Sequence, residues 1–278
     1  MLKKPKYGQH FLKHIHYAMK AVEAAELSPE DAVIEVGPGK GVLTKYLLPK
    51  AGLVLALEID SRFIDKLKEK FENHNNFEVR NLDARYISWD EVIGELREKG
   101  FKRIKLVANL PYYMATQMVM HVLASKARCD RLVVMVQDEV GRRLCSEPGS
   151  KDYSALSVAA RYYSEPHYVC RVPAKAFNPP PLVSSAIIRL DKREAPQVHV
   201  SDEEMFLYLV RSAFTHRRKT LRKCLQGLER APRQEYWESA LARAGIDSQR
   251  RPETLSLQEF ADINQALGDW MVPQPKEN

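Results

Sequence analysis

Cysteine is scarce in this sequence, and the few cysteines lie far from one another. Only four occur among 278 residues, at Cys129, Cys145, Cys170 and Cys224. Their spacing matches neither the clustered ligands of a zinc site nor the dense framework of a small disulfide-bonded domain. We therefore expect reduced thiols in a cytoplasmic protein, and no metal site.

Long apolar runs are also missing. No run reaches the roughly 20 residues that a membrane-spanning helix needs, so we expect no association with a membrane. The stretch MLKKPKYGQH at the start carries lysines but no apolar segment, and we therefore expect no secretory signal there. A chain of 278 residues is long enough for one large domain with its own core and a small second domain.

Acidic side chains are absent from residues 211–223. The whole chain has 43 lysines and arginines against 36 acids, and this modest net charge of +7 permits a polyanionic partner without requiring one. The run RSAFTHRRKTLRK concentrates the excess, and the candidate residues for contacts with a polyanion are Arg217, Arg218, Lys219, Arg222 and Lys223. A solvated basic helix face is the alternative explanation of such a run.

Short apolar runs alternate with helical patterns from Asp31 to about Leu190. Continuous apolar strands between helices are typical of a layered α/β domain with a mostly parallel sheet. The expected strands cover 32–36, 53–59, 76–82, 104–109, 131–137 and 184–190, and the last of them is expected to be antiparallel. The expected helices of this part cover 42–48, 61–71, 115–124 and 154–163.

The alternation ends at DKREAPQVHV, residues 191–200. After Ser201 the pattern is helical, with helices expected near 202–228, 234–244 and 256–267. We therefore expect an α/β domain over residues 1–195 and a small α-helical domain over residues 196–278.

Three successive strand ends carry groups that suit an adenosine-containing ligand. Gly37, Gly39 and Gly41 follow the first strand, where glycine permits a tight turn and a close approach of ligand to backbone. Their spacing is GxGxG, not the GxGxxG of the dinucleotide fingerprint. Glu58 ends the second strand and can accept hydrogen bonds from ribose hydroxyls, and Asp83 follows the third and can accept from an adenine amine.

The fourth strand end delivers Asn109, Leu110, Pro111 and Tyr112. The Asn109 side chain has a carbonyl acceptor, and Pro111 restricts the backbone so that the Leu110 carbonyl can be held in one direction. Two fixed acceptors beside a stacking ring suit a planar base that carries an amine. Acceptors outside the ring plane favour a pyramidal, more nucleophilic nitrogen, which is electrostatic preorganisation toward the transition state.

Seven motifs together resemble the ribosomal RNA adenine dimethyltransferases of the KsgA type. The motifs, collinear over nearly the whole chain, are YGQHFL (7–12), EVGPGKG (35–41), ALEID (56–60), NLPYY (109–113), QDEVGRRL (137–144), FNPPPLVSSAIIRL (177–190) and AFTHRRKTLRK (213–223). The resemblance implies a Rossmann-like S-adenosylmethionine methyltransferase domain over 1–195 and an RNA-binding helical domain over 196–278. It also implies a monomer that needs no metal, acts on the small ribosomal subunit and its rRNA, and contributes to small-subunit biogenesis. The implied reaction is dimethylation of the N6 amines of two adjacent adenosines in the 3′-terminal hairpin of the 16S rRNA.

The resemblance also implies roles for individual residues. The implied cofactor-binding residues are His10, Leu12, Gly37, Gly39, Glu58, Asp83 and Asn109. The implied catalytic residues are Asn109, Leu110, Pro111 and Tyr112, and the target base is expected to stack between Tyr112 and Phe177. The basic run 211–223 is expected to hold the rRNA backbone.

A few positions depart from the commoner family pattern. His10 stands where asparagine is common, and Leu182 stands where lysine is frequent after the prolines. Asp138 and Gly141 replace the commoner lysine and alanine. The motif therefore does not by itself imply the family's usual contacts with cofactor or RNA at His10, Asp138 and Leu182.

Three alternative functions remain open at this point. A sister enzyme methylates large-subunit rRNA, but its motif is usually N-I-P-Y, so Leu110 counts against it. A non-enzymatic RNA-binding assembly factor would not need the site residues, yet nearly all of them are present. A dehydrogenase is disfavoured by the GxGxG spacing and by the lack of a hydride-transfer set.

Overall fold

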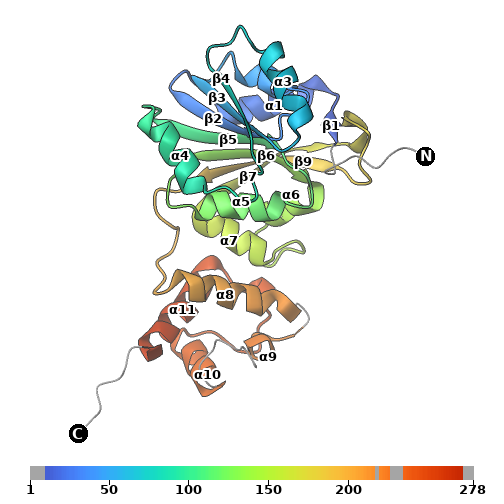
Figure 1. Cartoon of the computed structure of the whole chain (residues 1–278). Coiled ribbons are helices and arrows are strands. Elements are labelled where there is room, and N and C mark those ends of the chain that lie inside the picture. The colour runs from blue at the N-terminus through green and yellow to red at the C-terminus, as the bar shows by residue number, and fades with distance from the viewer. Residues whose placement is uncertain (1–9, 217–218, 226–233, 272–278) are drawn as a thin grey trace. The chain divides into compact units, whose positions relative to one another are not determined.

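The computed structural model describes residues 10–216, 219–225 and 234–271, and Figure 1 shows the order of its elements. The chain divides into two compact units. The first consists of Met1–Arg142 and Ser164–Glu194, and the second of Arg143–Tyr163 and Ala195–Asn278. Residues 143–163 thus pack with the C-terminal helices, although the sequence pattern places them with the α/β domain. The predicted roles of the two domains, methyl transfer for residues 1–195 and RNA binding for residues 196–278, stay predictions.

The first unit is built on a seven-stranded sheet in the order β4-β3-β2-β5-β6-β9-β7 (Figure 1). In chain order its strands are β2 (Asp31–Val36), β3 (Leu53–Glu58), β4 (Phe77–Asn81), β5 (Arg103–Asn109), β6 (Arg131–Gln137), β7 (Ser164–Val172) and β9 (Ser185–Lys192). The strands β2 to β6 run parallel, and β9 is antiparallel to both neighbours, β6 and β7. The predicted α/β class and the predicted reversal of β9 are both confirmed.

Helices cover both faces of this sheet. They are α1 (Ile15–Ala25), α2 (Thr44–Leu47), α3 (Ser61–Lys70), α4 (Trp89–Glu98), α5 (Ala115–Ala124) and α6 (Asp138–Cys145). In Figure 1, α4, α5 and α6 lie on one side of the sheet, and α1 and α3 lie on the other. Every residue of β2 and β3 is buried, as expected for central strands with helices on both faces.

Strand β7 was not predicted, and its sequence explains why. The segment SEPHYVCRV contains Pro166, mixes polar with apolar side chains and has a register irregularity between Tyr168 and Cys170. These features are tolerated because β7 lies at the edge of the sheet, where one side of the strand needs no hydrogen-bonding partner. Pairing with β9 therefore decides its conformation, not its own pattern.

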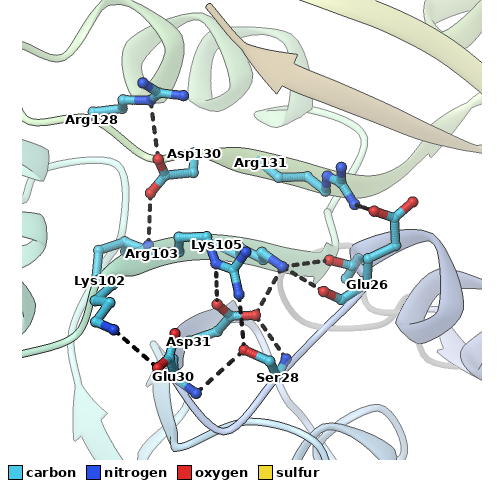
Figure 2. Close-up of polar contacts among 12 residues, drawn as sticks. Glu26, Ser28, Glu30, Asp31, Lys102, Arg103, Lys105, Arg128, Asp130 and Arg131 are labelled. Atoms are coloured by element: carbon cyan, nitrogen blue, oxygen red, sulfur yellow. Dashed lines mark hydrogen bonds and ion pairs between the residues drawn. The ribbon is translucent and has the colours of Figure 1, made fainter. Parts of the chain in front are cut away.

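A buried ionic network holds the amino-terminal edge of the sheet (Figure 2). Lys105 on β5 is nearly inaccessible, and its Nζ donates to Asp31 Oδ2 at 2.9 Å. The same Nζ donates to the carbonyls of Ala25 and Glu26 at 3.0 and 2.6 Å. Asp31 also accepts from Arg103 Nε at 2.8 Å, so each buried charge has several partners. The network ties α1, β2 and β5 together at the edge opposite to the predicted site.

The second unit is helical, but its longest predicted helix is interrupted. Its elements are α7 (Ala155–Tyr163), α8 (Glu203–Ala213), a 3₁₀ turn (Phe214–His216), α9 (Leu221–Leu225), α10 (Gln234–Arg243), a second 3₁₀ turn (Pro252–Thr254) and α11 (Leu257–Met271). The single helix predicted near 202–228 is therefore wrong. The Phe214 ring packs edge-on against Tyr153, and the Leu221 N–H donates to the Arg250 carbonyl at 2.8 Å. These tertiary contacts favour a turn where local propensity favours helix.

No helix in residues 10–216, 219–225 and 234–271 is long and apolar enough to cross a membrane.

Candidate active site

A pocket that is open to solvent lies at the carboxyl ends of the parallel strands. It brings together residues from four strand ends, the N-terminal segment and the loop before β9. Its lining includes nearly all the residues predicted for the site: His10, Gly37, Gly39, Glu58, Asp83, Asn109, Leu110, Pro111, Tyr112 and Phe177. Leu12 is the exception, because it is buried and lines a smaller adjacent pocket together with Gly37 and Asn109.

The glycine turn and Glu58 form one hydrogen-bonded unit. Gly39 has a φ of 55°, a conformation that favours glycine. Its N–H donates to Glu58 Oε2 at 2.9 Å, and the Asp60 N–H donates to Glu58 Oε1 at 2.9 Å. A Cβ on Gly39 would lie 2.9 Å from the Phe11 ring, so the turn needs glycine for space as well as for its backbone angle.

The Glu58 carboxylate is buried and still able to accept further hydrogen bonds. Burial raises its pKa, and the Asp60 and Gly39 N–H groups oppose this shift. Each oxygen accepts one hydrogen bond from the backbone and retains acceptor capacity. Because the same side chain lines the pocket, it can receive two donors from a bound ligand.

Asp83 also lines the pocket, but it is paired within the chain. Arg85 Nη2 lies 2.6 Å from Asp83 Oδ2, and Arg85 Nε lies 3.0 Å from Asp83 Oδ1. The Arg85 guanidinium holds the pKa of Asp83 below its ordinary value, so the group is ionised at neutral pH. This ion pair was not predicted from the sequence. A basic residue two positions after an acidic one is a sequence signal for such a pair.

The Asn109 carboxamide is oriented by the N-terminal segment. Its Nδ2 donates to the His10 carbonyl at 3.1 Å, which keeps the side-chain oxygen as the acceptor. The backbone N–H of Leu110 donates to the Met135 carbonyl at 3.1 Å, so the motif is tied to β6. Both contacts fix the motif without using the acceptor oxygens of Asn109 and Leu110.

Tyr112 points toward β9 and stacks on a flat partner. Its hydroxyl lies 2.7 Å from Ser185 Oγ, and burial raises its pKa. The His10 and Tyr112 rings are stacked, with centroids 5.9 Å apart and an interplanar angle of 30°. His10 Nδ1 is also 2.8 Å from the Pro179 carbonyl, so this side chain joins the N-terminal segment to the proline loop.

The N-terminal segment and the loop before β9 pair as a small second sheet. Strand β1 (Phe11–Leu12) runs antiparallel to β8 (Phe177–Asn178), with Leu12 opposite Phe177. Phe177 is buried and lines the pocket. This pairing joins segments about 165 positions apart and places Phe11 and Phe177 at the same pocket. The pairing could not be predicted from the sequence, because each strand is only two residues long.

Glu35 is a buried carboxyl group beside the glycine turn. Thr44 Oγ1 donates to Glu35 Oε2 at 2.6 Å, and the residue lines the smaller pocket. Burial raises the pKa of Glu35 to about 8, and the neighbouring Glu58 charge acts in the same direction. The motif EVGPGKG contains this residue, but the sequence gives no sign that its proton is retained.

The basic run is divided between two helices and the intervening turn. Arg217 and Arg218 lie outside the described residues. Lys219, Arg222 and Lys223 are exposed, while Leu221, Cys224 and Leu225 of the same stretch are buried. Arg222 forms an ion pair with Glu238 at 2.8 Å. The described part of the run therefore presents its cations to solvent on an amphipathic segment.

Comparison with known proteins identifies the family. The sequence model described as "Ribosomal RNA adenine dimethylase" matches residues 1–268. The chain belongs to the ribosomal RNA adenine dimethylase family. It is 44% identical over 266 residues to the Ribosomal RNA small subunit methyltransferase A of Pelotomaculum thermopropionicum. The aligned region covers 94% of this chain and 90% of the relative. The corresponding protein of Moorella thermoacetica is 44% identical over 265 residues, or 94% of this chain and 91% of the relative.

Solved structures agree with this membership. A dimethyladenosine transferase from Plasmodium falciparum matches with a TM-score of 0.77 and 26% identity over 91% of this chain and 96% of that one. The 23S rRNA methyltransferase ErmE matches with a TM-score of 0.70 and 27% identity over 92% of this chain and 99% of that one. The predicted family resemblance and the Rossmann-like methyltransferase fold are confirmed, and the family implies S-adenosylmethionine as the methyl donor.

Proposed function

We propose that this chain dimethylates the N6 amines of two adjacent adenosines in the 3′-terminal hairpin of small-subunit rRNA. The observation that carries the proposal is that Glu58, Asn109 and Tyr112 line one pocket at the carboxyl edge of the sheet. Relatives named as small-subunit methyltransferases, at 44% identity, support the choice of rRNA. The proposed partners are the small ribosomal subunit and its rRNA, and the proposed setting is subunit biogenesis by a cytoplasmic monomer.

The pocket suits S-adenosylmethionine by its donor and acceptor groups. Glu58 is positioned to accept from the ribose hydroxyls, and Asp83 from the adenine amine alongside its pair with Arg85. The turn at Gly37 and Gly39 leaves room for the methionine end, because no Cβ projects from either residue. His10 and Leu12 are proposed to close the site over the bound cofactor. When bound, the cofactor supplies an electrophilic methyl group on a sulfonium.

Asn109 and Leu110 are proposed to bind and orient the target amine. The Asn109 side-chain oxygen and the Leu110 carbonyl would accept its two N–H groups, and Pro111 limits the freedom of the backbone that carries them. This arrangement favours the nucleophilic form of the nitrogen without a metal. A second methylation requires that the monomethylated amine, which keeps one N–H, fit the same pocket.

Tyr112 and Phe177 are proposed to hold the flipped base. The stacking of the His10 ring on Tyr112 supports this role, because a base would make the same kind of flat contact. Phe177 lines the same pocket from the loop before β9. An adenine at this depth must leave its stack in the RNA, and aromatic contacts offset part of that cost.

The basic run is proposed to hold the RNA backbone. Lys219, Arg222 and Lys223 are exposed, and Arg217 and Arg218 belong to the same run. Contacts of lysine and arginine with phosphates are insensitive to sequence and weaken as salt concentration rises. Specificity for one hairpin would then come from RNA shape and from the surrounding particle.

The function is tested by methyl incorporation from labelled S-adenosylmethionine into unmethylated small ribosomal subunits. We expect dimethyladenosine at two adjacent positions of the 3′-terminal hairpin. Incorporation into large-subunit rRNA alone would favour a function like that of ErmE, whose fold matches with a TM-score of 0.70. Tight binding to subunits with no incorporation would favour a non-enzymatic assembly factor.

Replacing Glu58 by glutamine is expected to weaken cofactor binding by about 10- to 100-fold, as expected for the loss of charge-assisted hydrogen bonds. The new NH₂ group would face the Gly39 or Asp60 N–H, each of which now donates at 2.9 Å. Isothermal titration with S-adenosylmethionine measures the effect. Glu72→Gln, on an exposed turn outside the pocket, is the matched control. Equal affinities in the two variants would remove Glu58 from the cofactor site.

A further inference from the structure

Three side chains form a continuous cluster beside the pocket: Arg85, Tyr86 and Tyr113. The Arg85 guanidinium carbon lies 5.0 Å from the centroid of the Tyr86 ring and 5.7 Å from that of the Tyr113 ring. Arg85 and Tyr86 follow β4, whereas Tyr113 follows β5. The cluster therefore joins the ends of two strands that β3 and β2 separate in the sheet, at the edge where the pocket lies.

The two rings are unusually exposed for tyrosines that contact another side chain. Tyr86 is 80% exposed and Tyr113 is 57% exposed. Large aromatic surfaces left in water are unfavourable, and when they cluster they commonly mark a binding surface. The guanidinium between them is held by Asp83 through hydrogen bonds of 2.6 and 3.0 Å, so the plane of the cation is set before any ligand arrives.

The consecutive residues Tyr112 and Tyr113 lie in different environments. Tyr112 reaches Ser185 on β9, at 2.7 Å, and is partly buried. Tyr113 is more exposed, lies against Arg85 and also lines the pocket. One backbone segment thus offers one ring toward the inside of the site and one ring at its rim.

We propose that Arg85, Tyr86 and Tyr113 form a stacking platform for the unflipped nucleobase next to the target adenosine. The inference rests on the proposed function, because it assumes that an RNA strand delivers a base to the pocket. Every base has a flat π face, and tyrosine rings and guanidinium planes are the side chains on which single-stranded bases stack. A flipped base leaves its neighbour without one stacking partner, and a platform at the rim would replace that partner.

The position of the cluster favours RNA over the cofactor as its ligand. Asp83, Ala84 and Tyr113 line the pocket, but Arg85 and Tyr86 are not part of its lining. Tyr86 is 80% exposed, so the platform faces solvent beside the pocket that is proposed to take the target base. Because Asp83 pairs with Arg85, the platform adds little net charge, and stacking is its main contribution.

The test measures steady-state methylation of unmethylated small ribosomal subunits by the full chain. The double variant Tyr86→Ala/Tyr113→Ala should raise KM for subunits about tenfold or more, the loss expected for one stacked base. In the single variant Tyr86→Ala, whose ring lies outside the lining of the pocket, kcat and the affinity for S-adenosylmethionine should stay close to those of the wild type. Tyr86→Phe/Tyr113→Phe should restore a low KM, because phenylalanine keeps the rings.

Tyr168→Ala is the matched control, since it removes a tyrosine that is 39% exposed on β7 of the same unit. An active wild type with an unchanged KM in the alanine double variant would overturn the platform and leave the proposed function intact. Weaker cofactor binding with an unchanged KM for subunits would mean that the rings cover the cofactor, which also overturns the inference. A wild type that methylates no adenosine would instead refute the proposed function.

Discussion

Replacing Asn109 by alanine is expected to lower kcat for methyl transfer to small ribosomal subunits by about 100- to 1,000-fold. This is the cost observed when a preorganised polar group that stabilises the transition state is removed. The Asn109 oxygen is an acceptor that the fold leaves for a ligand, because the nitrogen of the same carboxamide donates to the His10 carbonyl at 3.1 Å. The effect should therefore fall mainly on kcat.

The fold should survive this substitution. The variant loses one hydrogen bond, that to His10, which is worth about 1 kcal/mol. Asn75→Ala is the matched control, because it removes a carboxamide from an exposed turn before β4. Thermal unfolding and cofactor titration of both variants separate a catalytic loss from a structural one. Turnover of Asn109→Ala at the wild-type rate would refute the role proposed for the motif.

Replacing Glu35 by glutamine is expected to remove a large pH dependence of stability. The pKa of Glu35 is raised from 4.5 to about 8, chiefly because burial disfavours its charged form. A carboxyl group whose pKa is higher in the folded state stabilises the fold below the unfolded pKa, and this contribution is lost as the pH rises through the folded pKa. For Glu35 the loss extends from about pH 4.5 to about pH 8 and amounts to about 5 kcal/mol.

Glutamine has the same shape, stays neutral and can still accept the Thr44 hydroxyl, which now lies 2.6 Å from the Glu35 carboxylate. We therefore expect wild type and Glu35→Gln to have similar free energies of unfolding at pH 5, with the variant more stable by several kcal/mol at pH 8.5. Urea unfolding at a series of pH values measures the difference. Glu72→Gln, whose carboxyl is exposed, should show no such divergence. Parallel pH profiles for wild type and Glu35→Gln would show that Glu35 is ionised in the folded protein.

Most of the candidate site could be anticipated because its residues follow strand ends. The carboxyl ends of parallel strands meet at one edge of a sheet, so Gly37, Glu58, Asp83 and Asn109 converge once the alternating pattern is recognised. The contacts that orient these groups could not be anticipated in the same way. The bond from Asn109 to His10 joins residues 99 positions apart, and no periodicity in the chain encodes it.

The sequence by itself determined the α/β class, the order of most strands and helices, and the motif that places the chain in its family. These features depend on local apolar periodicity and on residue types at strand ends, both of which are readable along the chain. Tertiary structure alone decided that β7 joins the sheet edge, that β1 pairs with β8, and that the predicted helix near 202–228 is interrupted after Ala213. It also decided that Asp83 pairs with Arg85 and that burial raises the pKa of Glu35. The physical reason is common to these cases: edge pairing, side-chain contacts and burial depend on neighbours distant in sequence, and they override weak local preferences.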